Sequence, residues 1–289
     1  MKNSQKIGFL SVLLFIVSCS TKKDAFLNRN YNALTTQYNI LYNGGVAFDQ
    51  GLNEINLNYE DDFFELLPIE PLSFENIKFR IPILSTGAKE PGIGFDVKKT
   101  EEPEEALTPF DIAEQKAVKA IQKHSMNING KERNKKIDDA YLLLGKSRYY
   151  TERFIPAIDA YNYIIANYPN ASLINETKIW RAKAHIRIEN EELAIETLEI
   201  LLRKPDLPDF IREDANTALA MAYAKLDSVN TVRNYLWEAT KTSKNKTQRA
   251  RNLFVLGQLY SLDKIKDTAS MVFKKLINFK QAPYKFRIH

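Results

Sequence analysis

A pattern of small and large residues recurs four times in the second half of the chain and limits the folds that it can adopt. Four small residues follow one another at steps of 37, 38 and 37: Gly145, Ala182, Ala220 and Gly257. Twelve residues after each of them stands another short side chain, at Ala157, Ala194, Val232 and Ala269. Sixteen residues after each stands a large apolar one, at Tyr161, Leu198, Leu236 and Phe273. A fixed period of this size predicts a stacked array of similar units.

The first unit, residues 136–169, predicts two amphipathic helices joined by a short polar turn. Apolar residues recur at three- and four-residue steps in both halves, and the second half ends before Pro169, which cannot continue a helix. Glycine inside a helix is unfavourable by about 1 kcal/mol relative to alanine. We therefore expect Gly145 to have a packing role, with Ala157 facing it so that the two backbones approach closely.

This unit resembles the tetratricopeptide repeat, whose basic length is about 34 residues. The resemblance implies an all-α fold, a superhelical α-solenoid of about four repeats over residues 136–289. Before it we expect a tether and a helical hairpin over 20–56, an irregular connecting segment over 57–108, and a connecting helix with a linker over 109–135. No polar capping helix follows the fourth unit, so we expect the array to be incomplete at the C-terminus.

The N-terminal residues 1–19 have the pattern of a lipoprotein signal peptide. Lys2 and Lys6 precede an apolar run over 7–17, and Cys19, the one cysteine of the chain, stands directly after Ile16-Val17-Ser18. The pattern resembles a bacterial lipobox, which implies that Cys19 is acylated and becomes the new N-terminus. Ser20 in the next position favours the outer membrane. The alternative is an ordinary signal peptide with a chance cysteine.

The residues that usually carry chemistry are scattered. His124, His185 and His289 are far apart in the sequence, and no glycine-rich phosphate loop follows a strand pattern. We therefore expect no enzyme activity, no metal, no cofactor and no small-molecule substrate. The net charge of +5 would suit nucleic acid in a cytoplasmic helical protein. An exported lipoprotein does not meet nucleic acid, so we expect none as a partner.

The concave groove of a repeat array is its usual binding surface. Alignment to the repeat pattern places a strip of basic and aromatic residues there: Lys146, Tyr150, Lys183, Arg187, Lys225, Arg251 and Phe254. Such a strip suits an acidic or C-terminal segment of a partner. Charge reversal at Lys146, Lys183 and Arg187 is expected to abolish partner capture without changing the melting temperature. The alternative is an unexceptional repeat surface.

The irregular segment contains an acidic run at 60–62, for which a solvated run is the simplest interpretation. Phe63 and Phe64 follow it. They could lead a partner-binding loop, or lie against the helical core, which we favour.

Residues 32–44, 120–126 and 137–146, together with Cys19 and the sequence Leu-Leu-Pro-Ile-Glu-Pro at 66–71, are similar to the N-terminal part of the SprE/PorW gliding-motility lipoproteins of Bacteroidota. The resemblance implies an outer-membrane lipoprotein that faces the periplasm and acts in type IX secretion, linking motor and ring components to the translocon. Its partners would be other secretion-system proteins, and the acyl groups on Cys19 would hold it at the membrane.

Two alternatives remain open. One is a periplasmic assembly factor for outer-membrane proteins. The other is a glycan-binding surface lipoprotein, which should present sugar-stacking tryptophans in long loops, whereas Trp180 and Trp237 fall inside predicted repeat helices.

Overall fold

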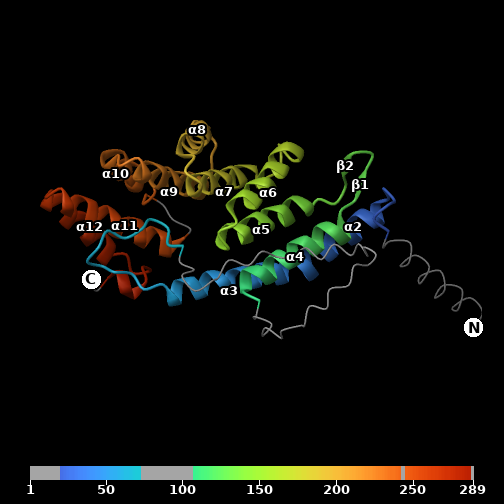
Figure 1. Cartoon of the computed structure of the whole chain (residues 1–289), viewed down its shortest axis with the longest axis horizontal. Helices are drawn as coiled ribbons and strands as arrows, with labels where there is room; N and C mark the ends of the chain where they lie inside the picture. Colours follow the sequence, from blue (N-terminus) through green and yellow to red (C-terminus); the bar gives the residue numbers. More distant parts are fainter. Residues whose placement is uncertain (1–19, 73–106, 242–244, 288–289) are drawn as a thin grey trace, which may run out of the picture.

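The structure is a computed structural model that describes residues 20–72, 107–241 and 245–287. In these residues the secondary structure is almost entirely helical, which confirms the all-α class. The chain forms an N-terminal layer, in which one long helix pairs with α4 (Pro109–His124), and a curved row of helices that follows this layer (Figure 1).

The N-terminal layer corrects the prediction of a helical hairpin over 20–56. Helices α2 (Phe26–Thr35) and α3 (Tyr42–Asn58) are joined by the π-helical segment Thr36–Leu41, so they form one continuous helix. The sequence Asn43-Gly44-Gly45 indicated a break between two helices, but these residues lie inside α3. Gly44 and Gly51 allow other side chains to pack closely on this helix. A Cβ atom at Gly44 would lie 2.7 Å from Cδ2 of Leu143, and one at Gly51 would lie 2.7 Å from the ring of Phe110. The helix that pairs with α3 is α4 (Pro109–His124).

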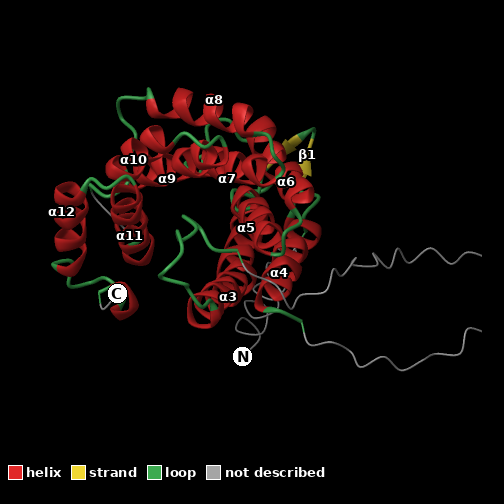
Figure 2. Cartoon of the chain, turned by 60° about the vertical axis from the view of Figure 1, so that its left-hand side comes forward, coloured by secondary structure: helices red, strands yellow, loops and turns green. Residues whose placement is uncertain are grey.

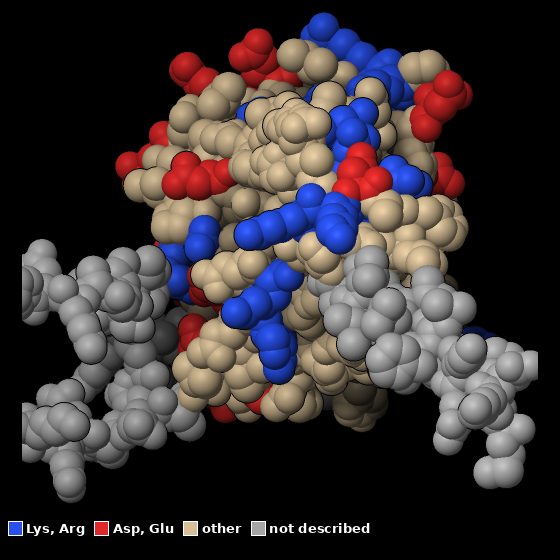
Figure 3. Space-filling model, turned by 90° about the vertical axis from the view of Figure 1, so that its right-hand side faces the viewer, with Lys and Arg blue, Asp and Glu red and all other residues tan. Residues whose placement is uncertain are grey.

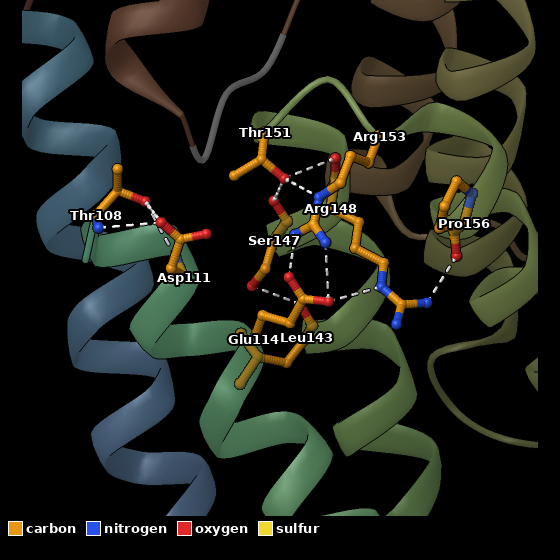
Figure 4. Close-up of polar contacts among 9 residues, drawn as sticks. All are labelled: Thr108, Asp111, Glu114, Leu143, Ser147, Arg148, Thr151, Arg153 and Pro156. Atoms are coloured by element: carbon orange, nitrogen blue, oxygen red, sulfur yellow. Dashed lines mark hydrogen bonds and ion pairs between the residues drawn. The ribbon is translucent and has the colours of Figure 1, made fainter. Parts of the chain in front are cut away.

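Helix α4 begins with the residues that its sequence predicts. Thr108 is the N-cap, and its hydroxyl accepts from the backbone N–H of Asp111 while the Asp111 carboxylate accepts from the backbone N–H of Thr108 (Figure 4). Pro109 occupies the first helical position, where its missing N–H has no intrahelical partner to lose. The connecting helix that was predicted, with a linker after it, over 109–135 is therefore present and ends at His124.

An ion-pair bridge attaches α4 to the first helix pair of the row. Glu114 of α4 accepts from Nε of Arg148 at 2.9 Å and is also ion-paired with Arg153 (Figure 4). Arg148 in turn donates through Nη1 to the carbonyl oxygen of Pro156 at 3.0 Å. One carboxylate thus connects α4 to α5 and to the residue that precedes α6.

The residues after α4, predicted as a polar linker, form a small β-hairpin. Strands β1 (Asn127–Ile128) and β2 (Lys131–Glu132) pair antiparallel across Asn129 and Gly130, which both have positive φ. Asn-Gly is the preferred sequence for such a two-residue turn. This hairpin was readable from the sequence and was missed.

The row consists of four helix pairs. Their bounds are α5 Ile137–Tyr150, α6 Phe154–Asn167, α7 Ile174–Arg187, α8 Glu191–Leu202, α9 Asp209–Lys225, α10 Val229–Glu238, α11 Lys246–Leu262 and α12 Lys266–Ile277. Each helix packs against the next along the chain, and α7 also contacts α5 and α9. The row curves, with the first helices of the pairs toward the inside (Figure 2).

The four small residues of the repeat pattern occupy equivalent positions. Each lies five residues before the last residue of a first helix, where the helices end at Tyr150, Arg187, Lys225 and Leu262. The second set, Ala157, Ala194, Val232 and Ala269, lies three residues after the start of each second helix. Both sets are buried. The sequence period therefore corresponds to a repeated structural unit.

The glycines of the first and fourth pairs are covered by aromatic rings. A Cβ atom at Gly145 would lie 2.3 Å from Cε1 of Tyr161, and one at Gly257 would lie 2.6 Å from the ring of Phe273. From the sequence we expected the close approach of Ala157 to require a glycine at position 145. In the structure it is the ring of Tyr161, sixteen residues after Gly145, that leaves no room for a side chain there. In the second and third pairs the small residue is alanine and the large one is leucine. Glycine thus accompanies a flat ring, and alanine a branched side chain.

The turns inside the four pairs share one backbone conformation. The second residue after each first helix has a φ between 52° and 61°, at Glu152, Glu189, Asp227 and Lys264. None of these is glycine, although this left-handed region favours it. Four turns of the same length and conformation give the pairs the same internal geometry.

Candidate functional site

The concave side of the row is occupied by a segment of the same chain. Residues 59–72, which follow α3, contain no helix or strand and run into the hollow of the curve, against α7 and α11 (Figures 1 and 2). We call residues 59–72 the groove segment. Two of its carboxylates are each ion-paired with two cations. Glu70 pairs with Lys183 and Arg187 of α7, and Asp61 pairs with Arg251 of α11 and with Lys285 of the short 3-10 helix Tyr284–Phe286. The predicted irregular segment of 57–108 is therefore partly described, and its remaining residues 73–106 lie outside the described structure.

The carboxylate of Asp61 is enclosed by cations. Its side chain is 0% exposed, and both its oxygens accept from the guanidinium of Arg251, at 2.7 and 2.8 Å. Nζ of Lys285 lies 2.8 Å from the same carboxylate. Burial raises the pKa of Asp61, but the hydrogen bonds from Arg251 and Lys285 outweigh it and hold the pKa below its ordinary value. The interpretation of residues 60–62 as a solvated run is wrong for Asp61.

Glu70 forms the second anchor, nine residues further along. Its carboxylate is ion-paired with Lys183 and with Arg187, whose Nη2 lies at 3.0 Å, and it accepts from the hydroxyl of Tyr149. Burial raises the pKa of Glu70, but the charges of Lys183 and Arg187 outweigh it and lower the pKa below its ordinary value. Burial also raises the pKa of Tyr149 well above its usual range, so this hydroxyl remains a donor.

Side chains of α7 and α11 also contact the backbone of the groove segment. Gln258 accepts from the backbone N–H of Leu67 at 3.0 Å and donates to the carbonyl oxygen of Glu65 at 2.7 Å. Gln248 donates to the carbonyl oxygen of Ile69 at 2.8 Å. Contacts of this kind recognise an extended peptide independently of its side chains, whereas the two carboxylates and the apolar residues between them add sequence specificity.

Apolar contacts complete the fit of the groove segment. Leu67 and Ile69 are buried, and the ring of Phe63 lies edge-on to Phe254 with 5.1 Å between centroids. Phe63 therefore lies against the helical core, as favoured from the sequence. Phe64 does not, since its side chain is fully exposed.

The structure places the predicted groove residues in three different surroundings. Lys183, Arg187, Arg251 and Phe254 contact the groove segment as described above. Lys146 is ion-paired with Glu176 of α7 and lies 5.2 Å from the ring centroid of Trp180. Tyr150 is buried and stacks on Phe110 at 5.1 Å, so it belongs to the core and not to an accessible groove surface. Partner binding by these residues stays a prediction.

Lys225 alone of the predicted set is exposed, at the edge of a cavity. The cavity measures about 340 Å³ and lies between the groove segment and helices α7, α9, α10 and α11. Its walls are mainly apolar, and include Leu66, Ile69, Ile186, Met221, Val232 and Leu259. Lys225 makes no ion pair within the described residues. The groove thus keeps an open, mainly apolar space, with Lys225 and Asp227 among its charged lining residues.

Other predicted residues bear on the site less directly. Cys19 and the signal residues 1–19 lie outside the described structure, as does His289. His124 contributes to packing, with Nδ1 at 2.9 Å from Oδ1 of Asn32. No group of three metal-ligating side chains gathers within residues 20–72, 107–241 and 245–287. In the same residues, no helix combines the length and the apolar character that crossing a membrane requires.

The two groove carboxylates predict a dependence of stability on pH. Each has a lower pKa in the folded chain than its ordinary value, 3.8 for Asp61 and 4.5 for Glu70. Their contribution is therefore complete above about pH 5 and is lost as the pH falls through the folded pKa values. We expect the free energy of unfolding to fall steeply below about pH 4.5, and Glu70→Gln to remove part of that slope. Chemical unfolding measured between pH 7 and pH 3 tests this, and equal slopes in both proteins would contradict it.

No protein-family model matches the chain, and no curated protein matches it at a significant level.

Proposed function

We propose that the chain is a non-catalytic scaffold that binds other proteins in the concave groove of a tetratricopeptide-type superhelix. The equivalent positions of the four small residues and the four identical turns support this repeat assignment. In this proposal Cys19 carries the lipid that holds the chain at the outer membrane, facing the periplasm. The sequence resemblance to the SprE/PorW lipoproteins supports a role in type IX secretion and gliding, linking motor and ring components to the translocon.

The observation that carries the proposal is the way in which the groove holds the groove segment. Side-chain amides contact its backbone, cations are ion-paired with Asp61 and Glu70, and apolar residues fill the space between. A surface that binds an extended acidic segment in this manner is suited to similar segments of other proteins. The groove segment does not fill the apolar cavity beside Lys225, so this cavity is open to a partner of this kind.

The glycan-binding alternative has less support. The ring of Trp180 is covered by Nζ of Lys183, 4.1 Å from its centroid, and packs edge-on against Tyr149 at 5.4 Å. Nζ of Lys275 lies 4.8 Å from the ring centroid of Trp237. Stacking on a sugar needs an open aromatic face, and these cations compete for it. A periplasmic assembly factor remains the second candidate, because it would use the same groove.

Cross-linking in intact cells, followed by identification of the attached protein, tests the proposed function. We expect a motor or ring component of the secretion system to be captured by the wild type and lost in Lys225→Glu. Lys274→Glu is the matched control, because Lys274 is also an exposed lysine in the last turn of a helix but lies on α12. Charge reversal at Lys183 or Arg187 is unsuitable, since both hold Glu70 and the change would also alter the melting temperature.

Two outcomes would oppose the proposal. Capture of a barrel-assembly component would favour the assembly factor. Equal capture by Lys225→Glu and the wild type, with equal melting temperatures, would exclude the rim of the cavity as the binding surface.

A further inference from the structure

The long N-terminal helix carries an exposed apolar stripe. Seven large apolar side chains along it are more than half exposed, and five of these follow one line: Leu27, Leu34, Tyr38, Tyr42 and Val46. We call these five residues the stripe. Their spacings are seven, four, four and four residues. In a soluble protein, so many exposed apolar side chains in one line mark a surface that another apolar surface covers.

The π-helical segment keeps the stripe on one side of the helix. In a regular α-helix, residues repeatedly spaced by four drift around the axis, because a turn takes 3.6 residues. A π-helical turn takes in more residues, so four-residue steps through Thr36–Leu41 drift less. The buried side of the same helix follows the same step, at Asn28, Asn32, Thr36, Ile40 and Gly44. The helix therefore has a buried face that packs on the rest of the molecule and a separate apolar face.

The charges around the stripe suit an anionic lipid surface. Between Ala25 and Phe48 the only charged residue is Arg29, and no acidic residue occurs. Exposed lysines lie at the end of the molecule that carries α2: Lys22, Lys23, Lys119, Lys123, Lys131 and Lys135. Figure 3 shows Lys and Arg side chains forming a band across this end. A helix with tyrosines and leucines on one face, next to basic residues, has the composition of a segment that lies in the interface of a membrane.

We propose that the stripe lies on the membrane surface, as a second contact beside the lipid on Cys19. The inference rests on the proposed location at a membrane. The groove segment follows the same helix directly, from Tyr59 on. A helix lying flat on the bilayer would therefore fix the direction in which the row extends from it.

Site-directed nitroxide labels on vesicles of phosphatidylethanolamine and phosphatidylglycerol test the proposal. The full chain carries Cys19→Ala, so that no acyl group can be added and an introduced cysteine is the only one. Tyr42→Cys is compared with Ile155→Cys, because Tyr42 and Ile155 are both 65% exposed but lie on different helices. We expect the label at position 42 to collide with oxygen at least twofold more often than with a water-soluble nickel complex, and the label at 155 to show the reverse.

The possible outcomes distinguish membrane binding by the stripe from dimer formation through it and from membrane binding by the lipid on Cys19. Equal accessibility at positions 42 and 155, or a chain that stays in solution, would overturn the proposal. A dimer in the absence of lipid that Tyr38→Glu dissociates would also overturn it, by assigning the stripe to a second copy of the chain. Acylation is read separately, from the mass of the N-terminal peptide of the wild type. Its absence would contradict the proposed lipid anchor without affecting the label result.

Discussion

Replacing Glu70 with alanine is expected to lower the free energy of unfolding by about 3–5 kcal/mol. The change leaves Lys183 and Arg187 close together and mostly buried, with no carboxylate between them. Removing one partner of a buried ion pair has an effect of this size because the remaining charge is uncompensated. It also removes the acceptor of the Tyr149 hydroxyl. Urea denaturation at pH 7 measures the difference.

Glu65→Ala provides the matched control in the same segment. Glu65 is exposed, and its side chain makes no ion pair in the described structure. We expect this variant to lie within about 0.5 kcal/mol of the wild type. A Glu70→Ala variant that is equally close to the wild type would show that the groove segment is not held by its carboxylate.

Replacing Gly145 with leucine is expected to destabilise the chain by about 3 kcal/mol, the upper end of the usual range for overpacking. A Cβ atom at this position would lie 2.3 Å from the Tyr161 ring. Because that ring is completely buried, it has no room to move aside. Gly257→Leu is expected to have a smaller effect, because the Phe273 ring is only partly buried. Thermal and chemical unfolding of the two variants compare them directly.

The second and third helix pairs indicate which second substitution would compensate for a larger residue at position 145. They combine alanine with leucine, at Ala182 with Leu198 and at Ala220 with Leu236. Gly145→Ala together with Tyr161→Leu copies that combination into the first pair. We expect the double variant to be at least about 1 kcal/mol more stable than the sum of the two single effects. Strict additivity would contradict the equivalence of the four pairs.

The repeats were predictable from the sequence because their signal is local and periodic. The step of 37 or 38 residues placed Gly145, Ala182, Ala220 and Gly257 at equivalent helix positions. The continuity of the N-terminal helix could not be predicted, because Gly44 and Gly45 are compatible with two different structures. Glycine permits a turn, and it also permits the close approach that Leu143 makes to Gly44.

The cations of the groove were predictable, but the occupant of the groove was not. Arg187 and Arg251 were identified by their repeat positions. Glu70 and Asp61 lie 117 and 190 residues from them in the sequence, and no local pattern reports a contact over such separations. Leu67 and Ile69 stand two residues apart, between Asp61 and Glu70. This alternating spacing of apolar residues indicates that the segment has a buried face.

The binding of a labelled peptide with the sequence of residues 59–72 tests most directly whether the groove recognises acidic extended segments. In the wild type the groove segment competes at a high effective concentration, on the order of millimolar. Fluorescence anisotropy should therefore show binding at least tenfold tighter to the Asp61→Asn, Glu70→Gln variant than to the wild type. A peptide carrying the same two changes should bind neither protein. Equal binding of the two peptides, or no binding of either to the variant, would contradict a groove that recognises acidic segments.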